Sequence, residues 1–563
     1  MLQSSISYVH GACDEPLIGD TIDARFDRAA TEWPTREALI VPYQGIRWTY
    51  ADLAKRVNAL ASALLAHGLI PGDRVGIWSP NSSEWAITQF ATAKIGLILV
   101  TINPAYRIGE AEYALNKVGC KALILATAHK TSNYIAMLNE LAPELAESVP
   151  GHLVSERLPE LRVVTQIGGC TPGALSFDRL VESGMGLAPD ERAAAAQRLN
   201  FDDAINIQFT SGTTGSPKGA TRTHHNILNN AYFSGKALRL CADDRLCLPV
   251  PLYHCFGMVL GNLMAMQYGA ALVYPSDAFD PLAVLQSVEK ERCTVLYGVP
   301  TMFIAEMEHP EFHNFDLSCL RTGIMAGSPC PIEVMRRVID SMHLQEITIG
   351  YGMTETSPLS CQGSPDDPIE RRVATVGRVH PHVEIKIVCK DGETAPRGTP
   401  GELLVRGYSV MQRYWDDPAK TADAIDGAGW LHTGDLATLD KQGYCNIVGR
   451  VKDMVIRGRE NIYPREIEDA LYEHPEIEEV QAFGVPDPKF GEQVCVWVRC
   501  RIGAHLSEED IRQHCRQRLA HFKVPHYVKF VNTFPMTVTG KVRKFEMRTQ
   551  ASQELGLSEI KTA

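Results

Sequence analysis

The chain has 563 residues, 45% of them hydrophobic and 22% charged, which is typical of a globular protein with two or three domains. Its 55 basic and 67 acidic residues give a net charge of −12, which argues against a broad nucleic-acid-binding surface. Apolar runs such as residues 96–100 are far shorter than the ~20 residues that span a bilayer, so no transmembrane segment is expected.

From about residue 20 to residue 450, strand-like segments alternate with helix-like segments. The expected strands include residues 74–78, 121–125, 294–297 and 347–349. The expected helices include residues 83–95, 282–289 and 331–342, the last with Pro331 in its first turn. This alternation predicts largely parallel or mixed sheets covered by helices.

The pattern changes in the last third of the chain. Strand-like residues 383–388 and 402–406 predict a small antiparallel unit. Beyond a charged stretch at 450–453, the expected elements are a helix from Pro464, a strand at 494–498 and a helix at 508–519. We therefore predict an α/β fold with a large N-terminal domain (1–449) and a small, mobile α+β C-terminal domain (450–563).

Fifteen cysteines are scattered without a C-x-x-C pair, which indicates reduced thiols rather than a disulfide frame or a zinc site. The first twenty residues have neither the basic and apolar regions of a signal peptide nor the arginines of a transit peptide. The expected location is therefore cytoplasmic.

The stretch 210–219 (TSGTTGSPKG) follows a strand-like segment at 204–209. Its glycines allow close backbone approach, its hydroxyls donate hydrogen bonds and its lysine adds a charge, a combination that suits a polyphosphate. It is not a Walker loop, because Pro217 and Gly219 stand where that pattern needs glycine and Ser or Thr. A polar surface loop is the plain alternative.

Three further segments carry residue types suited to nucleotide chemistry: YGMTE (351–355), GWLHTGD (429–435) and NTFPMTVTGKVRK (532–544). Each is weak by itself, because an aspartate after glycine is commonly a turn residue and a lone lysine is commonly solvated. Together with PLYH (251–254), GRVKDM (449–454) and ENIYP (460–464), they resemble the adenylate-forming superfamily. That superfamily includes acyl-CoA synthetases, peptide-synthetase adenylation domains and firefly luciferase.

The resemblance extends from Thr49 to Lys541 and implies two half-reactions. A carboxylate attacks the α-phosphate of ATP, with Mg²⁺ bound, to give acyl-AMP and pyrophosphate. The thiol of coenzyme A then displaces AMP. The segments PNSSEW (80–85) and VTINPAYR (100–107) are most similar to the branch that activates medium-chain fatty acids.

The resemblance also implies roles for single residues. The β- and γ-phosphates would be held by the loop residues Thr210, Ser211, Gly212, Thr213, Thr214, Gly215 and Lys218. Thr354 would contact the α-phosphate and Glu355 would help to hold Mg²⁺. Asp435 would take the ribose hydroxyls, and Arg450 would support the ribose and the phosphates. The adenine would be framed by Gly327, Ser328 and Tyr351.

Lys541 is the expected adenylation catalyst, because a lysine that bridges the substrate carboxylate and the α-phosphate both positions them and stabilises charge. Lys452 is the expected hinge between the domains; an exposed lysine is its alternative. Gly458 would face the pantetheine channel. His254 would sit beside the acyl group and gate that channel, or would be a packed core histidine. Arg459 replaces the glycine usual in relatives and would pair with a coenzyme A phosphate or be solvated.

An apolar acyl pocket is expected from Phe256, Met258, Val259, Val299, Met302 and Met325. The main interpretation is a medium-chain fatty acid–CoA ligase. Its alternatives are a ligase for short branched, aromatic or sulfur-containing acids, an adenylation module that loads a carrier protein, and a binding protein without catalysis. The expected partners are the acid, ATP and coenzyme A, and a homodimer is compatible with the sequence.

Overall fold

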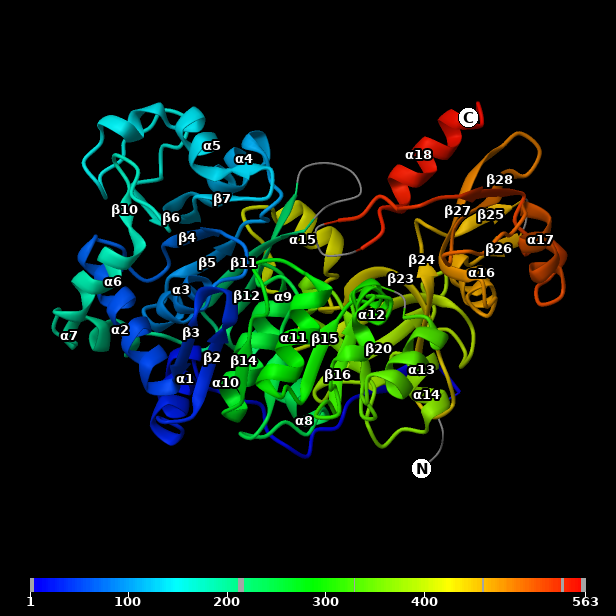
Figure 1. Cartoon of the computed structure of the whole chain (residues 1–563), viewed down its shortest axis with the longest axis horizontal. Coiled ribbons are helices and arrows are strands. Elements are labelled where there is room, and N and C mark those ends of the chain that lie inside the picture. Colours follow the sequence, from blue (N-terminus) through cyan, green and yellow to red (C-terminus); the bar gives the residue numbers. More distant parts are fainter. Residues whose placement is uncertain (1–4, 211–216, 329, 458–459, 538–540, 558–563) are drawn as a thin grey trace.

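The computed structural model describes residues 5–210, 217–328, 330–457, 460–537 and 541–557. Two large sheets, a five-stranded sheet and a two-stranded sheet of β7 (Ala128–His129) and β8 (Ser132–Asn133) form the N-terminal part of the molecule. A further sheet forms the C-terminal part at the right of Figure 1. This is the predicted α/β fold with a large N-terminal domain and a small C-terminal domain.

An eight-stranded sheet contains the predicted strands at 74–78, 121–125 and 204–209. Its order is β10 (Leu175–Ser176), β9 (Val163–Ile167), β6 (Cys120–Ala126), β4 (Arg74–Trp78), β5 (Ile98–Thr101), β11 (Ala204–Thr210), β12 (Lys218–Thr223) and β22 (Arg413–Tyr414). The strands are parallel as far as β11, and β12 and β22 then continue antiparallel. The sheet is therefore mixed.

A nine-stranded sheet lies beside it. Its order is β19 (Arg378–Val379), β18 (Leu359–Gln362), β17 (Thr348–Gly352), β16 (Thr322–Ala326), β15 (Val295–Gly298), β13 (Arg245–Cys247), β14 (Ala271–Val273), β2 (Glu37–Val41) and β3 (Ile46–Thr49). The run from β17 to β2 is parallel, so the carboxyl ends of β16 and β17 share one edge. That edge is a common place for ligand sites in α/β proteins.

Helices cover these two sheets (Figure 1). They include α1 (Ile22–Glu32), α2 (Tyr50–Ala66), α3 (Ser83–Lys94), α4 (Ile108–Val118), α5 (Tyr134–Leu141), α6 (Phe177–Met185), α7 (Asp190–Ala196), α8 (His224–Ala237), α11 (Pro281–Glu291), α12 (Pro300–Met307), α13 (Ile332–Ser341) and α14 (Ile369–Ala374). Caps explain several starts: Ser82 accepts a hydrogen bond from the Trp85 amide at the start of α3. Pro331 proves to be the N-cap of α13, one residue before the first turn in which the sequence placed it.

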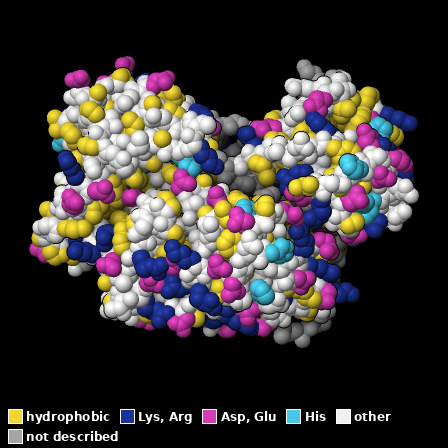
Figure 2. All heavy atoms as spheres, viewed as in Figure 1, with side chains coloured by type: hydrophobic (Ala, Val, Ile, Leu, Met, Phe, Trp, Pro, Cys, Tyr) yellow, Lys and Arg dark blue, Asp and Glu magenta, His cyan; other side chains and the backbone are white. Residues whose placement is uncertain are grey.

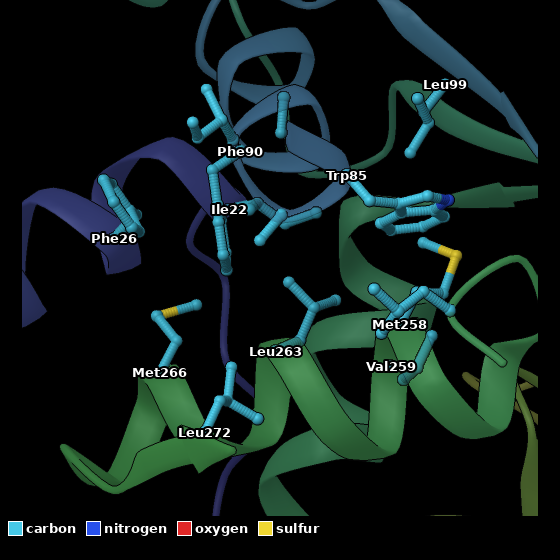
Figure 3. Close-up of a cluster of buried hydrophobic side chains, with 14 of the residues drawn as sticks. Ile22, Phe26, Trp85, Phe90, Leu99, Met258, Val259, Leu263, Met266 and Leu272 are labelled. Carbon is cyan, nitrogen blue, oxygen red and sulfur yellow. The ribbon is translucent and has the colours of Figure 1, made fainter. Parts of the chain in front are cut away.

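The main hydrophobic core fills the space between the two large sheets. Figure 3 shows part of it, where α1 and α3 bring Phe26 and Phe90 together with Leu263 and Met266 of a third helix. The rings of Phe26 and Phe90 stack with their centroids 4.6 Å apart. This packing holds the third helix, which begins directly after His254, against the sheets.

The five-stranded sheet of the N-terminal part is the predicted antiparallel unit. Its order is β1 (Tyr8–His10), β20 (Val383–Val388), β21 (Gly401–Gly407), β23 (Leu431–Leu439) and β24 (Cys445–Arg450). The C-terminal sheet contains β26 (Glu460–Ile462), β25 (Val455–Arg457), β28 (Gly491–Cys500), β27 (Ile477–Asp487) and β29 (Tyr527–Phe530), with α16 (Pro464–Tyr472), α17 (Glu508–Arg516) and α18 (Lys544–Glu554).

The surface carries no large area of one charge sign on the face shown in Figure 2, where acidic and basic side chains are interspersed. Within the described ranges, no helix is long and apolar enough to cross a membrane.

The buried carboxyl group of Glu306 leads to a prediction about stability. Glu306 of α12 is 0% exposed, and neither of its side-chain oxygens has a hydrogen-bond partner among the described residues. Burial raises the pKa of this carboxyl well above its usual range. A raised pKa in the folded state adds stability that is present below the unfolded pKa and is lost as the pH rises.

We therefore expect Glu306→Met to increase the free energy of unfolding by about 1–3 kcal/mol at pH 8, and by less at pH 5. Urea denaturation at both pH values measures the change, with the exposed Glu311→Met as the control. A gain that is the same at both pH values would contradict the titration as its cause.

Candidate active site

The phosphate-loop prediction falls on a β-hairpin. Thr210 ends β11 and Lys218 begins β12, and the two residues are register partners. Lys218 Nζ lies 4.8 Å from the ring centroid of Tyr414 on β22. The remaining predicted phosphate contacts, Ser211, Gly212, Thr213, Thr214 and Gly215, lie outside the described residues. The two ends of the loop therefore meet at one edge of the eight-stranded sheet.

Glu355 joins this hairpin to the neighbouring sheet. It lies in a 3₁₀ turn (Thr354–Thr356) directly after β17 and is 6% exposed. Its Oε1 accepts hydrogen bonds from Thr210 Oγ1 at 3.2 Å and from Tyr414 Oη at 2.8 Å. Thr354 is also buried, with its Oγ1 3.9 Å from Cys255 Sγ. Tyr414 was not predicted from the sequence, because no local pattern shows that β22 pairs with β12.

Asp435, Arg450 and Tyr351 form a second cluster. Asp435 on β23 and Arg450 on β24 are register partners, and Arg450 Nε donates to Asp435 Oδ1 at 3.1 Å. Tyr351 of β17 donates from its hydroxyl to Asp435 Oδ2 at 2.7 Å. Asp435 raises the pKa of Arg450, and burial together with Asp435 raises that of Tyr351 well above its usual range. Tyr351 and Arg450, both predicted to hold the nucleotide, thus meet at Asp435, which was predicted for the ribose.

Gly327 stands at the carboxyl end of β16 with a φ of +91°, a conformation that favours glycine. A Cβ atom there would lie 3.1 Å from Val299 Cγ1 and 3.6 Å from Lys541 Cε. Ser328 follows it, and its carbonyl accepts from Cys330 Sγ at 3.5 Å. The absence of a side chain at Gly327 therefore leaves space beside Lys541.

Lys541 comes from the C-terminal domain but lies in this N-terminal site. Its backbone amide donates to Thr537 Oγ1 at 3.0 Å. Burial lowers the pKa of its ammonium group, and so does the nearby charge of Arg450, while Cys255, Asp435 and Glu355 act in the opposite direction. The carboxylates of both clusters are thus close enough to Lys541 to interact with its charge.

His254 lies before a continuous helix made of α9 (Cys255–Gly257), a π-helical turn (Met258–Leu263) and α10 (Met264–Tyr268). Its Nδ1 accepts a hydrogen bond from the Phe256 amide at 3.2 Å, so it caps that helix. Burial lowers its pKa well below its usual range, and the charges of Lys541 and Arg222 add to this effect. His254 is therefore neutral at pH 7 and lies beside the site.

The predicted acyl-pocket residues do not all share one region. Phe256, Met258, Val259, Val299 and Met302 belong to the main core cluster, where Figure 3 shows Met258 and Val259 near Trp85. Met325 belongs to a second cluster, on the opposite face of β16 from Ile324 and Ala326. The sequence prediction was wrong in grouping it with the other five, because adjacent strand residues face opposite sides.

A cavity of about 690 Å³ opens between the two domains next to this site. It is lined by Tyr253 and Met302 from the N-terminal domain and by Glu479, Arg499 and Thr537 from the C-terminal domain. Glu479 and Arg499 form an ion pair of 3.1 Å, and burial raises the pKa of Glu479 to about 7. Met302 was predicted for the acyl pocket, and Tyr253 and Thr537 lie within the motifs at 251–254 and 532–544, whereas Glu479 and Arg499 were not singled out from the sequence.

Lys452 lies in a turn between β24, which ends at Arg450, and β25, which begins at Val455. The amides of Asp453 and Met454 both donate to the Arg450 carbonyl. Gly458 and Arg459 lie outside the described residues.

Comparison with known families gives two matches. The profile of the AMP-binding enzymes matches residues 26–415, and that of the AMP-binding enzyme C-terminal domain matches residues 466–541. The chain belongs to the AMP-binding enzyme family. It is therefore a member of the adenylate-forming superfamily, as the sequence motifs predicted.

Similar individual proteins indicate which branch of the AMP-binding enzymes this chain belongs to. The medium-chain acyl-CoA ligase ACSF2, mitochondrial, of Danio rerio is 46% identical over 98% of this chain and 91% of its own length. The putative acyl-CoA synthetase YngI of Bacillus subtilis is 46% identical over 96% of this chain and 99% of its own length. These relatives place the chain among the acyl-CoA ligases, enzymes that use ATP and coenzyme A.

A solved structure shows the same fold. The anthranilate CoA ligase AuaEII, in complex with anthranoyl-AMP, superposes with a TM-score of 0.86 at 26% identity, covering 97% of this chain and 99% of its own. The arrangement of both domains described above is therefore one that an acyl-CoA ligase adopts around an acyl adenylate.

Proposed function

We propose that Lys541 and the two clusters around Glu355 and Asp435 carry out the adenylation of a fatty acid. The observation that carries this proposal is the position of Lys541. Its Cε lies beside Gly327, 3.6 Å from where a Cβ atom would stand there, and its charge interacts with those of Glu355 and Asp435. An ammonium group held there neutralises charge that develops when the carboxylate attacks the α-phosphate.

The remaining roles follow from donor and acceptor chemistry. Asp435 accepts two hydrogen bonds now, and its carboxylate suits the two ribose hydroxyls of ATP. Thr210 and Lys218, with Ser211–Gly215 between them, suit the β- and γ-phosphates. Thr354, beside Glu355, suits the α-phosphate. Tyr351, Gly327 and Ser328 lie at the carboxyl ends of β17 and β16, where the adenine would fit.

Glu355 also fits a magnesium site. Mg²⁺ commonly binds one or two carboxylates together with substrate phosphates, and Glu355 supplies one buried carboxylate at the loop. The structure describes no group of three or more His, Cys, Asp or Glu side chains placed to hold a metal. A bound Mg²⁺ would neutralise phosphate charge, and Glu355 would orient it through the oxygen not occupied by Thr210 and Tyr414.

In the second half-reaction the thiol of coenzyme A attacks the acyl carbonyl and AMP leaves. We propose that Lys452 is the hinge about which the C-terminal domain rotates between the two half-reactions. The rotation would move Lys541 away from the site and open a channel for the coenzyme A thiol. Gly458 would line that channel and His254 would lie at its entrance. The domains then run 1–449 and 450–563.

We propose a medium-chain fatty acid as the substrate, supported by the name of the Danio rerio relative and by the apolar Phe256, Met258, Val259, Val299 and Met302. The cytoplasmic location stays a prediction, and the relative from Danio rerio is named as mitochondrial. The homodimer also stays a prediction. Cell fractionation and sedimentation would test them.

The substrate prediction concerns chain length. Each buried CH₂ adds ~0.8 kcal/mol, so we expect kcat/KM to rise about fourfold per carbon up to a medium chain length and then to stop rising. AMP release with coenzyme A, measured over straight-chain acids from four to sixteen carbons, would show this break.

Branched and aromatic acids belong in the same panel, because the superposed AuaEII structure is an anthranilate ligase. A panel in which benzoate or anthranilate is used faster than every straight-chain acid would overturn the fatty-acid assignment. A protein that exchanges pyrophosphate but makes no thioester with free coenzyme A would instead be a carrier-loading module.

A further inference from the structure

Arg222 is a fully buried arginine beneath the active site. It lies on β12, is 0% exposed, and its Nη2 donates to the side-chain oxygens of Asn206 and Gln208 on β11. The Gln208 contact is 2.7 Å. Asn206, Gln208 and Thr210 alternate along β11 and therefore share one face, and Thr210 donates to Glu355. A row of polar side chains thus leads from Arg222 to Glu355.

The charge of Arg222 has no carboxylate at ion-pair distance within the part of the chain that the structure describes. Its Nε and Nη1 make no well-oriented hydrogen bond there. Burial lowers the pKa of this guanidinium, whereas Cys255 and the charge of Glu355 act in the opposite direction. Cys255 in turn lies 3.9 Å from Thr354 Oγ1. The guanidinium is thus connected to Thr354 through Cys255 and interacts with the charge of Glu355, the two residues proposed for the α-phosphate and Mg²⁺.

An arrangement of this kind is unfavourable for folding alone. A buried charge without an opposite partner destabilises the folded state, and an apolar side chain of similar volume is often as stable or more stable. An arginine keeps its proton even when buried, so this position carries a permanent positive charge. Held by Asn206 and Gln208, the charge needs no rearrangement when negative charge arrives in front of it.

We propose that Arg222 is a positioning residue for adenylation, which supplies a fixed positive charge behind Thr354 and Glu355 and orients the end of β11 where the phosphate loop begins. The inference rests on the proposed adenylation function. It concerns the half-reaction in which pyrophosphate forms, because the second half-reaction no longer contains the β- and γ-phosphates.

The test compares Arg222→Met, which removes the charge, with Arg222→Lys, which keeps it. ATP–pyrophosphate exchange measures the first half-reaction, and thioester formation from supplied acyl-AMP measures the second. We expect Arg222→Met to lower kcat for exchange about 10- to 100-fold, the range seen when a supporting residue behind a ligand is removed. Thioester formation should stay within about threefold of wild type, and Arg222→Lys should recover much of the exchange activity.

Gln208→Glu is a second variant, which leaves the Arg222 guanidinium in place but puts a carboxylate beside it as an ion-pair partner. It should lower exchange in the same direction without lowering the melting temperature. Full exchange activity in Arg222→Met would overturn the inference, and so would equal losses in both half-reactions with a lower melting temperature, or no recovery in Arg222→Lys. If the wild-type protein itself shows no acid-dependent exchange, the proposed function fails first.

Discussion

Replacement of Lys541 with alanine is expected to reduce acid-dependent ATP–pyrophosphate exchange by about 10²–10³-fold or more. The loss of one preorganised charge-stabilising group in an active site has an effect of this size. Lys541 is the cation that the C-terminal domain brings to the Glu355 and Asp435 clusters. The alanine substitution therefore removes the charge from the place where the substrate carboxylate and the α-phosphate would meet.

The same variant should still make thioester from supplied acyl-AMP at close to the wild-type rate, because the bond to the α-phosphate is then already formed. Lys529→Ala is a suitable control, since Lys529 forms a partly exposed ion pair with Glu554 and belongs to neither cluster. Equal losses of exchange and of thioester formation in Lys541→Ala would refute the assigned role and would indicate damage to the domain.

Alkaline pH should reproduce part of this loss. Burial and Arg450 lower the pKa of Lys541, so its ammonium loses its proton at a lower pH than a free lysine. The exchange rate should therefore fall on the alkaline side before the usual lysine range is reached, and Lys541→Arg, which stays charged, should lack this decline.

The structure brings several of the predicted site residues together through contacts that the sequence did not show. Asp435, Arg450 and Tyr351 were each assigned to the nucleoside from motifs, and the structure shows that strand register and one tyrosine hydroxyl join them. The register depends on pairing between β23 and β24, which are close in sequence. Such local pairing leaves a readable pattern, because the alternation of side chains along each strand fixes which residues face the site.

Contacts that depend on distant strands left no such pattern. Tyr414 reaches Glu355 only because β22 pairs with β12, some 190 residues away in sequence. Arg222 appears in the sequence as one basic residue after the loop, and nothing local indicates that it is fully buried. Met325 is apolar and adjacent to Ile324, but successive strand residues face opposite sides, so it joins another core.

Helix starts, in contrast, could be predicted from the sequence, because a capping residue and the amide that it accepts from are only three positions apart. Asp280, with Pro281 after it, accepts from the Ala283 amide, and Ser507 forms a capping box with Asp510. Both helices begin close to where the sequence placed them. Two starts differed by one position. The helix expected from residue 282 begins at Pro281, and Pro331 is an N-cap and not a first-turn residue, because proline suits both positions.

Replacement of Lys452 with proline is expected to separate the two half-reactions in the opposite sense. The chain passes between the two sheets over residues 451–454, and the Arg450 carbonyl accepts from the amides of Asp453 and Met454. Proline fixes φ near −65° and removes the amide proton of residue 452, which restricts rotation at this turn. Because Lys541 already lies in the site, adenylation needs no rotation from this arrangement.

We therefore expect Lys452→Pro to form acyl-AMP within about threefold of the wild-type rate but to make thioester at least about 100-fold more slowly, because domain closure commonly limits such steps. Lys452→Ala is the matched control: it removes the charge but keeps the backbone free, and both steps should stay near wild type. If alanine slowed the thioester step as much as proline did, the ammonium group and not the backbone would be responsible. If proline slowed both steps equally, the turn would hold the domains together without serving as the axis between them.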